Sequence, residues 1–251
     1  MSKKRNRSNS TPATDSGRFP AVDALRGMAL LAMFAYHFSF DLNYFGLIRQ
    51  NFYEAPFWIA SRTAILSSFL LLVGISLALA NRAGIRWSLF FRRLGQITGC
   101  AVLVSIGSYA MFPQSWIYFG VLHHIALASV VSLAFLRFEW GNLGLGLFFI
   151  GLGTTVKLPL FDTSWLQWIG LMTHKPITED YVPMLPWFGL VLIGIFAGKR
   201  LLSANKTGIK TWRPAHGFSR LLILAGRHSL LLYMVHQPVF IGLLYLLKTS
   251  A

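Results

Sequence analysis

The chain has 251 residues, of which 55% are hydrophobic and only 12% are charged, and its mean hydropathy is +0.55. A soluble domain carries about 25% charged residues, so this composition excludes an ordinary soluble protein and favours a helical membrane protein. The formal net charge of +15 would suggest a nucleic-acid partner in a soluble chain. In a chain this apolar we expect the lipid bilayer, and no nucleic acid, as the partner. The single Cys100 excludes an intramolecular disulfide.

Residues 1–18 form a polar, basic stretch, which we expect to be a disordered cytoplasmic tail. The apolar segment that follows is too long for a signal peptide and contains Arg26 and His37, so we interpret it as a retained first span. Residues 19–251 are predicted to form one transmembrane domain.

Seven apolar segments are long enough, at about 20 residues each, to cross roughly 30 Å of hydrocarbon. The sequence therefore predicts an all-α, polytopic bundle of about seven transmembrane helices. The fifth segment is the weakest, because GNLGLGLFFIGLGTTV is rich in glycine. The predicted spans are 23–45, 57–80, 94–112, 118–136, 142–160, 183–201 and 221–246.

Most of the 23 lysines and arginines fall in the N-terminal tail and in every second connection between the predicted spans. Lysine and arginine accumulate in cytoplasmic loops, so the pattern predicts an N-terminus inside and a C-terminus outside. The acidic segment 161–183 then falls on the outer side.

The first predicted span carries four ionisable residues on one side. At about 100° per residue, Asp23, Arg26, His37 and Asp41 fall within roughly 60° of one another on a helical wheel. A charge at mid-membrane costs at least about 2.5–3.5 kcal/mol, so such a stripe should face protein or water. Asp23 as a helix cap, Arg26 as an interfacial anchor, and His37 with Asp41 as a structural pair are the alternatives.

Further polar residues lie near the outer ends of other spans. Arg62 is close to the start of the second span and could neutralise Asp41. His123 and His124 begin the fourth span, and their side chains point about 100° apart on a helix, so at most one should share a cavity with His37. His236 lies in the last span, where a buried histidine bonded to a neighbouring helix is the structural alternative.

The two sides of the predicted bundle differ in chemistry. The cytoplasmic side is basic, and Arg26, Arg92, Arg93 and Arg227 are candidates to bind a phosphorylated donor. The outer side holds histidines and carboxylates that can transfer protons. No histidine or cysteine spacing matches a zinc motif, and no phosphate-binding loop or nucleophile elbow is present, so no metal site is predicted.

The stretches RFPAVDALRGMALLAMFAYHFSFDLNYFG, FGVLHHIALA, PWFGLVLIGIFAG and GRHSLLLYMVHQPV together resemble the heparan-alpha-glucosaminide N-acetyltransferase catalytic-domain family, over about residues 18–247. The spacing of Arg26 and His37 also resembles that in the first helix of the membrane acyltransferase-3 group. The chain is much shorter than the lysosomal member of the family, and we expect a protein of the bacterial inner membrane.

The resemblance implies an integral-membrane acyltransferase that moves an acyl group, acetyl above all, from cytosolic acetyl-CoA to an amine or hydroxyl of a sugar-like acceptor on the far side. It also places His37 at the family's catalytic polar position and Arg26 where the phosphates of the donor approach. We interpret His37 as the general base, Asp41 as the group that orients it, and His123 or His236 as the group that polarises the thioester carbonyl.

Two other functions compete with this interpretation. The same polar stripe can serve as the proton relay of a small-solute transporter, although no inverted repeat is visible. A non-catalytic scaffold is the third hypothesis. The identity of the acceptor, the acyl chain length, a direct or a covalent acyl-histidine route, and assembly into a homo-oligomer are left open by the sequence.

Overall fold

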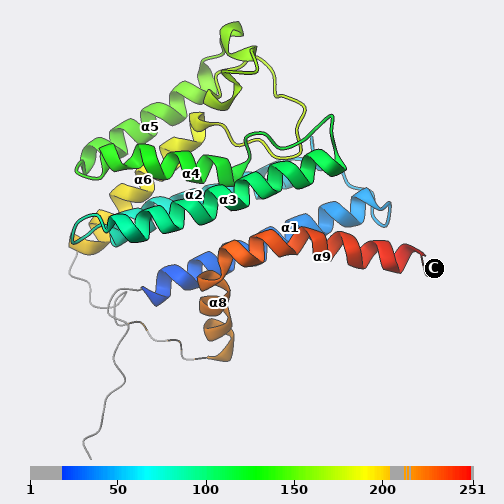
Figure 1. Cartoon of the computed structure of the whole chain (residues 1–251), viewed down its shortest axis with the longest axis horizontal. Helices are drawn as coiled ribbons and strands as arrows, with labels where there is room; N and C mark the ends of the chain where they lie inside the picture. The colour runs from blue at the N-terminus through cyan, green and yellow to red at the C-terminus, as the bar shows by residue number, and fades with distance from the viewer. Residues whose placement is uncertain (1–18, 204–211, 213, 215, 250–251) are drawn as a thin grey trace, which may run out of the picture.

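The computed structural model describes residues 19–203, 212, 214 and 216–249, and the predicted tail, residues 1–18, lies outside them. Within the described residues the fold is all-helical, as predicted (Figure 1). The long helices are α1 (Pro20–Tyr44), α2 (Pro56–Ala80), α3 (Trp87–Met111), α4 (Val121–Val131), α5 (Trp140–Thr155), α6 (Met184–Ser203), α8 (Gly217–Arg227) and α9 (Ser229–Thr249), and the short 3₁₀ helices are η1 (Ser132–Phe135), η2 (Pro159–Asp162) and η3 (Gln167–Ile169).

Each of the seven predicted segments contains a helix, and Figure 1 shows that successive long helices run back and forth across the molecule. The ends of these helices, and the connections between them, therefore lie at two opposite ends of the molecule. The basic end holds the start of α1 and the arginine-containing connections 81–86 and 136–139. The loop end holds the connections 45–55, 112–120 and 156–183.

Two helices differ from the sequence prediction. α3 begins at Trp87, so Arg92 and Arg93 belong to its first turns instead of to a loop. The last predicted segment is two helices, because the backbone leaves the helical conformation at His228 (φ −103°, ψ 24°), between α8 and α9. Figure 1 shows α8 lying across the direction of α9.

Four helices of the described chain are long and apolar enough to cross a membrane: α2, α3, α6 and α9. α1 has the length but carries the polar stripe. α4 and η1 together form a shorter apolar helix, Val121–Phe135. α5 has 16 residues and is also shorter than the four helices named above. The predicted number of seven spans and the predicted orientation are therefore not confirmed by length and composition.

α6 packs against both α2 and α5 and is the best-buried helix of the bundle. Small residues allow the close approach: a Cβ atom at Gly74 would collide with the backbone of α6, and one at Gly194 would collide with the backbone of α2. Gly146 and Gly189 play the same part between α5 and α6. Helices in membranes commonly associate through such small residues, because van der Waals contact replaces the hydrophobic effect.

α1 packs closely against α8 at its first turns. Gly27 of α1 lies against the backbone of Leu222 in α8, and Gly226 of α8 lies against the backbone of Asp23, so that neither glycine has room for a side chain. Ala24 and Ile223 complete this small apolar contact. The start of α1 is thus fixed against α8, which positions the charged residues at the basic end.

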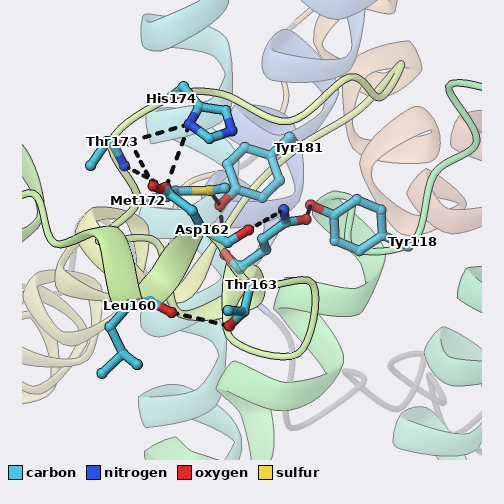
Figure 2. A network of polar contacts seen from close by, with 9 residues as sticks. Tyr118, Leu160, Asp162, Thr163, Met172, Thr173, His174 and Tyr181 are labelled. Atoms are coloured by element: carbon cyan, nitrogen blue, oxygen red, sulfur yellow. Dashed lines mark hydrogen bonds and ion pairs between the residues drawn. The ribbon is translucent and has the colours of Figure 1, made fainter.

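A network of polar contacts links residues of the connection 156–183 to one another and to the segment before α4 (Figure 2). Asp162 accepts hydrogen bonds from the backbone N–H and the hydroxyl of Thr173, at 2.8 and 2.7 Å, and the hydroxyl holds the pKa of Asp162 below its usual range. Tyr118 donates to the side-chain oxygen of Gln167 at 2.7 Å. The network ties the connection to the segment before α4.

Candidate active site

α1 and α9 lie side by side, and aromatic rings hold them in contact (Figure 1). The ring of Phe34 stacks on the ring of His236, with centroids 5.4 Å apart. Phe38 meets Phe240 edge-on at 5.3 Å, one turn nearer the loop end. These contacts keep the ring of His236 turned towards α1.

His37 and Asp41, one turn apart on α1, meet His236 and Gln237 of α9. The ring centroids of His37 and His236 are 5.1 Å apart. The side-chain nitrogen Nε2 of Gln237 lies 3.5 Å from Nδ1 of His37 and 3.5 Å from Oδ1 of Asp41. We call these four residues the seam cluster. In the described structure Asp41 reaches His37 through this amide and not by a direct hydrogen bond.

Three polar atoms of the seam cluster are buried and have no hydrogen-bond partner among the described residues: Oδ2 of Asp41, Nε2 of His236 and Oε1 of Gln237. Buried polar groups in folded proteins are almost always hydrogen-bonded, so each exception needs an explanation. Three exceptions on adjoining side chains of two facing helices point to a site that binds a polar group.

A second cluster, the basic-end cluster, is centred on Asp23. Arg26 donates to Oδ1 of Asp23 at 3.0 Å and to the hydroxyl of Ser76 on α2 at 2.6 Å. Arg227 of α8 places its Nε atom 3.5 Å from Oδ2 of Asp23. Arg93 of α3 lies near enough for the charges of Arg26 and Asp23 to act on it. Side chains of α1, α2 and α8 therefore meet here with two arginines and one carboxylate, and a third arginine, Arg93 of α3, lies within range of their charges.

The four arginines predicted to bind a donor are not equivalent in the structure. Arg26 is only 16% exposed and also lies 3.4 Å from the carbonyl oxygen of Gly226, so it joins α1, α2 and α8. Arg227 is 37% exposed. Arg92 is exposed and makes no hydrogen bond or ion pair within the described residues. The binding of a donor by these arginines stays a prediction.

The adjacent histidines of α4 have other partners. Nδ1 of His123 accepts the N–H of Gly120 at 3.3 Å, and its Nε2 lies 3.1 Å from the hydroxyl of Ser105 on α3. His124 is fully buried, with Nδ1 at 3.2 and 3.1 Å from the carbonyl oxygens of residues 182–183. Neither histidine contacts the seam cluster in the part of the chain that is described, and the catalytic role predicted for His123 stays a prediction.

An open depression of about 570 Å³ lies at the loop end, just beyond the last turn of α1. Its lining is rich in amide groups and also contains an arginine and a tyrosine. The polar residues lining it are Asn43, Arg49, Gln50, Asn51 and Tyr53. Because Asn43 follows Asp41 closely on α1, the depression lies near the end of the helix that carries the seam cluster.

Gln237 and Ser76 are the site residues that sequence reasoning missed. Gln237 stands next to His236 in the chain. Ser76 lies in an apolar helix, where a hydroxyl can donate to a backbone carbonyl of the preceding turn, as Ser76 does to the carbonyl oxygen of Leu72 at 2.6 Å. Both are uncharged and so add nothing to a pattern of charges. An amide in the middle of an apolar helix is the signal that could have singled out Gln237.

An all-helical fold with long apolar helices and two internal polar clusters defines a membrane protein with a buried polar site. Residues 18–238 match the sequence model of the family described as heparan-alpha-glucosaminide N-acetyltransferase, catalytic. The match covers most of the chain, which therefore belongs to this family of membrane acetyltransferases. No curated relative and no solved structure matches the chain.

Proposed function

We propose that the protein is an acetyl-CoA-dependent acetyltransferase of the bacterial inner membrane. The acetyl group passes at the seam cluster to a primary amine of a sugar-like acceptor, which approaches from the loop end. The observation that carries the proposal is that two imidazoles, a carboxylate and an amide meet between α1 and α9, where three of their polar atoms are buried without a hydrogen-bond partner among the described residues. The family supports acetyl transfer as the chemistry.

The basic-end cluster and its surroundings supply the donor site in this proposal. Arginine guanidinium groups bind phosphate through paired N–H donors, and Arg92, Arg93 and Arg227 have side chains near the basic end that can do so. α1 carries both clusters, and Arg26 and His37 are separated by about 16 Å of helix rise. The pantetheine arm of the donor would run along α1 to bring the thioester to the seam cluster.

The unpaired atoms of the seam cluster favour an amine over a hydroxyl. Oε1 of Gln237 can only accept hydrogen bonds, and the same is true of Oδ2 of Asp41 when this carboxyl group is ionised. Nδ1 of His236 lies 2.6 Å from the carbonyl oxygen of Tyr233, so the proton of this imidazole is on Nδ1 and its Nε2 is also an acceptor. Three acceptors suit a group with several N–H donors, as a primary amine or ammonium has.

Acetyl transfer by the purified protein in detergent tests this proposal. Glucosamine offers an amine, whereas N-acetylglucosamine offers the same hydroxyls with its nitrogen already acylated. We expect mass spectrometry to detect acetylation of the first sugar only. His37→Ala should lower the rate by at least about 10²-fold, the usual contribution of a group that transfers protons or polarises the substrate. Transfer by His37→Ala at the wild-type rate would contradict a catalytic role of the seam cluster.

Donor binding is tested by thermal unfolding. Acetyl-CoA should raise the unfolding temperature, because a ligand that binds only the folded state stabilises it. Arg227→Gln should reduce this shift, and Arg49→Gln, an exposed arginine at the loop end, should leave it unchanged. A protein that acetyl-CoA does not stabilise, and that carries a solute into proteoliposomes without it, would support the transporter instead.

A further inference from the structure

We propose that Gln237 fixes the positions of the ring protons in the seam cluster, so that His236 is the base of the reaction and His37 is the hydrogen-bond donor. This assignment rests on the proposed acetyl transfer and reverses the roles that the sequence suggested for the two histidines. It follows from the hydrogen-bonding partners of each ring nitrogen.

The side-chain amide of Gln237 has only one orientation that suits its neighbours. The atom that lies 3.5 Å from both Oδ1 of Asp41 and Nδ1 of His37 is Nε2. A carboxylate only accepts hydrogen bonds, so the reversed amide would place two acceptor oxygens face to face. The NH₂ group has two hydrogens, one for Asp41 and one for His37. Nδ1 of His37 is therefore an acceptor, and the proton of this imidazole is on Nε2.

His236 has the opposite tautomer. Its Nδ1 donates to the carbonyl oxygen of Tyr233 at 2.6 Å, and a carbonyl oxygen can only accept. Its Nε2 carries the free lone pair, and this atom is buried without a partner among the described residues. Phe34 stacks on the ring and holds its orientation. Two imidazoles with centroids 5.1 Å apart therefore offer different groups, an N–H on His37 and a lone pair on His236.

These two groups match the two needs of an acyl transfer. The acceptor nitrogen attacks the carbonyl carbon of the thioester and forms the C–N bond, while its proton passes to Nε2 of His236. The electron pair of the carbonyl moves to its oxygen, which accepts a hydrogen bond from Nε2–H of His37. When the C–S bond breaks, the thiolate of CoA takes the proton from His236, which restores the neutral ring. The products are an amide and free CoA.

Glutamine substitutions separate the two roles, because glutamine keeps an N–H donor and cannot act as a base. His37→Gln should keep a measurable transfer rate. His236→Gln should fall by about 10²–10⁴-fold, the usual contribution of a general base, and should be at least about tenfold slower than His37→Gln. His216→Gln, at an exposed position before α8, is the matched control and should transfer at the wild-type rate. Fast transfer by His236→Gln together with an inactive His37→Gln would overturn the assignment, while acetyl transfer itself would stand.

The tautomers are measured directly by NMR of the histidine ring nitrogens in the full-length protein. The signals that disappear in His37→Gln should show a proton on Nε2, and those that disappear in His236→Gln should show one on Nδ1. Gln237→Met, which keeps a side chain of similar length without an N–H donor, should release His37 into a mixture of tautomers and leave His236 unchanged. A proton on Nδ1 of His37 in the wild type, or a His37 spectrum that Gln237→Met does not alter, would refute the role of Gln237. This readout needs no activity, so it stays decisive if the protein transfers no acetyl group and the proposed function fails.

Discussion

At the scale of single residues, Asp23 is the carboxylate on which two arginines from different helices converge, Arg26 of α1 and Arg227 of α8. The sequence suggested that Asp23 is a helix cap, but the N-cap residue of α1 is Phe19. The side chain of Asp23 is only 12% exposed. Removing one partner of a buried ion pair leaves the other charge without compensation, so this carboxylate should matter more than a surface acid.

Asp23→Asn is expected to lower the free energy of unfolding by about 1–3 kcal/mol, because Arg26 and Arg227 would then lie close together without a counter-charge. Thermal or denaturant unfolding in detergent measures the change. Glu139→Gln is the matched control: Glu139 pairs with Arg200 at 3.1 Å, but the two side chains are 37% and 53% exposed. Exposed pairs contribute about 0–1 kcal/mol. Equal losses in the two variants would show that burial does not strengthen the pairing of Asp23.

The residues of the candidate site could be predicted only in part. His37 and Asp41 could be predicted, because an ionisable residue in an apolar helix is costly. The two residues also fall on the same side of the helical wheel as the other ionisable residues of α1. Their partner Gln237 carries no charge and gave no such signal. The local partners of His123, Gly120 and Ser105, depend on how the chain enters α4, which the sequence pattern does not describe.

At the scale of helices, the apolar segments located every long helix, because about 20 apolar residues are needed to cross the hydrocarbon. The start of α3 was misplaced, since Arg92 and Arg93 resemble loop charges although long basic side chains can reach water from a helix end. The break at His228 was also missed. Close to the break, Gly226 lies against the backbone of Asp23, a tertiary contact between distant segments that the sequence pattern does not describe.

The packing of α2 on α6 should be sensitive to one methyl group. Gly194→Ala would place a Cβ atom against the backbone carbonyl oxygen of Leu71, and backbone atoms cannot move aside as a flexible side chain can. We expect the free energy of unfolding to fall by about 1–3 kcal/mol, the usual cost of overpacking. Gly99→Ala on α3 is the matched control, because no atom of the described residues lies within 4 Å of its Cβ position.

Gly99→Ala should leave the protein equally stable or stabilise it by up to about 1 kcal/mol, because alanine favours the helix more than glycine. Both variants are compared by thermal unfolding in the same detergent. A Gly194→Ala variant as stable as Gly99→Ala would mean that α2 and α6 are farther apart than described.

At the scale of the whole molecule, α5 decides the topology. Its 16 residues give a rise of about 24 Å, which is shorter than the roughly 30 Å of hydrocarbon that a span must cross. If α5 crosses, all seven segments alternate and the two ends of the described chain lie on opposite sides. If it does not, the connections 136–139 and 156–183 face the same side of the membrane, which contradicts the described arrangement with these connections at opposite ends of the molecule.

Labelling of single cysteines with a membrane-impermeant thiol reagent distinguishes these two topologies. In a Cys100→Ala background, Glu54→Cys reports the loop end and Arg137→Cys the basic end, while Lys157→Cys reports the far end of α5. The excess of lysine and arginine in every second connection predicts that intact cells label Glu54→Cys and Lys157→Cys, and that Arg137→Cys reacts only after permeabilisation. The Cys100→Ala background itself should remain unlabelled. Reaction of Lys157→Cys only after permeabilisation would place both ends of α5 inside. The acidic connection 156–183 would then face the cytosol, and the acceptor could not approach the seam cluster from the side opposite the donor.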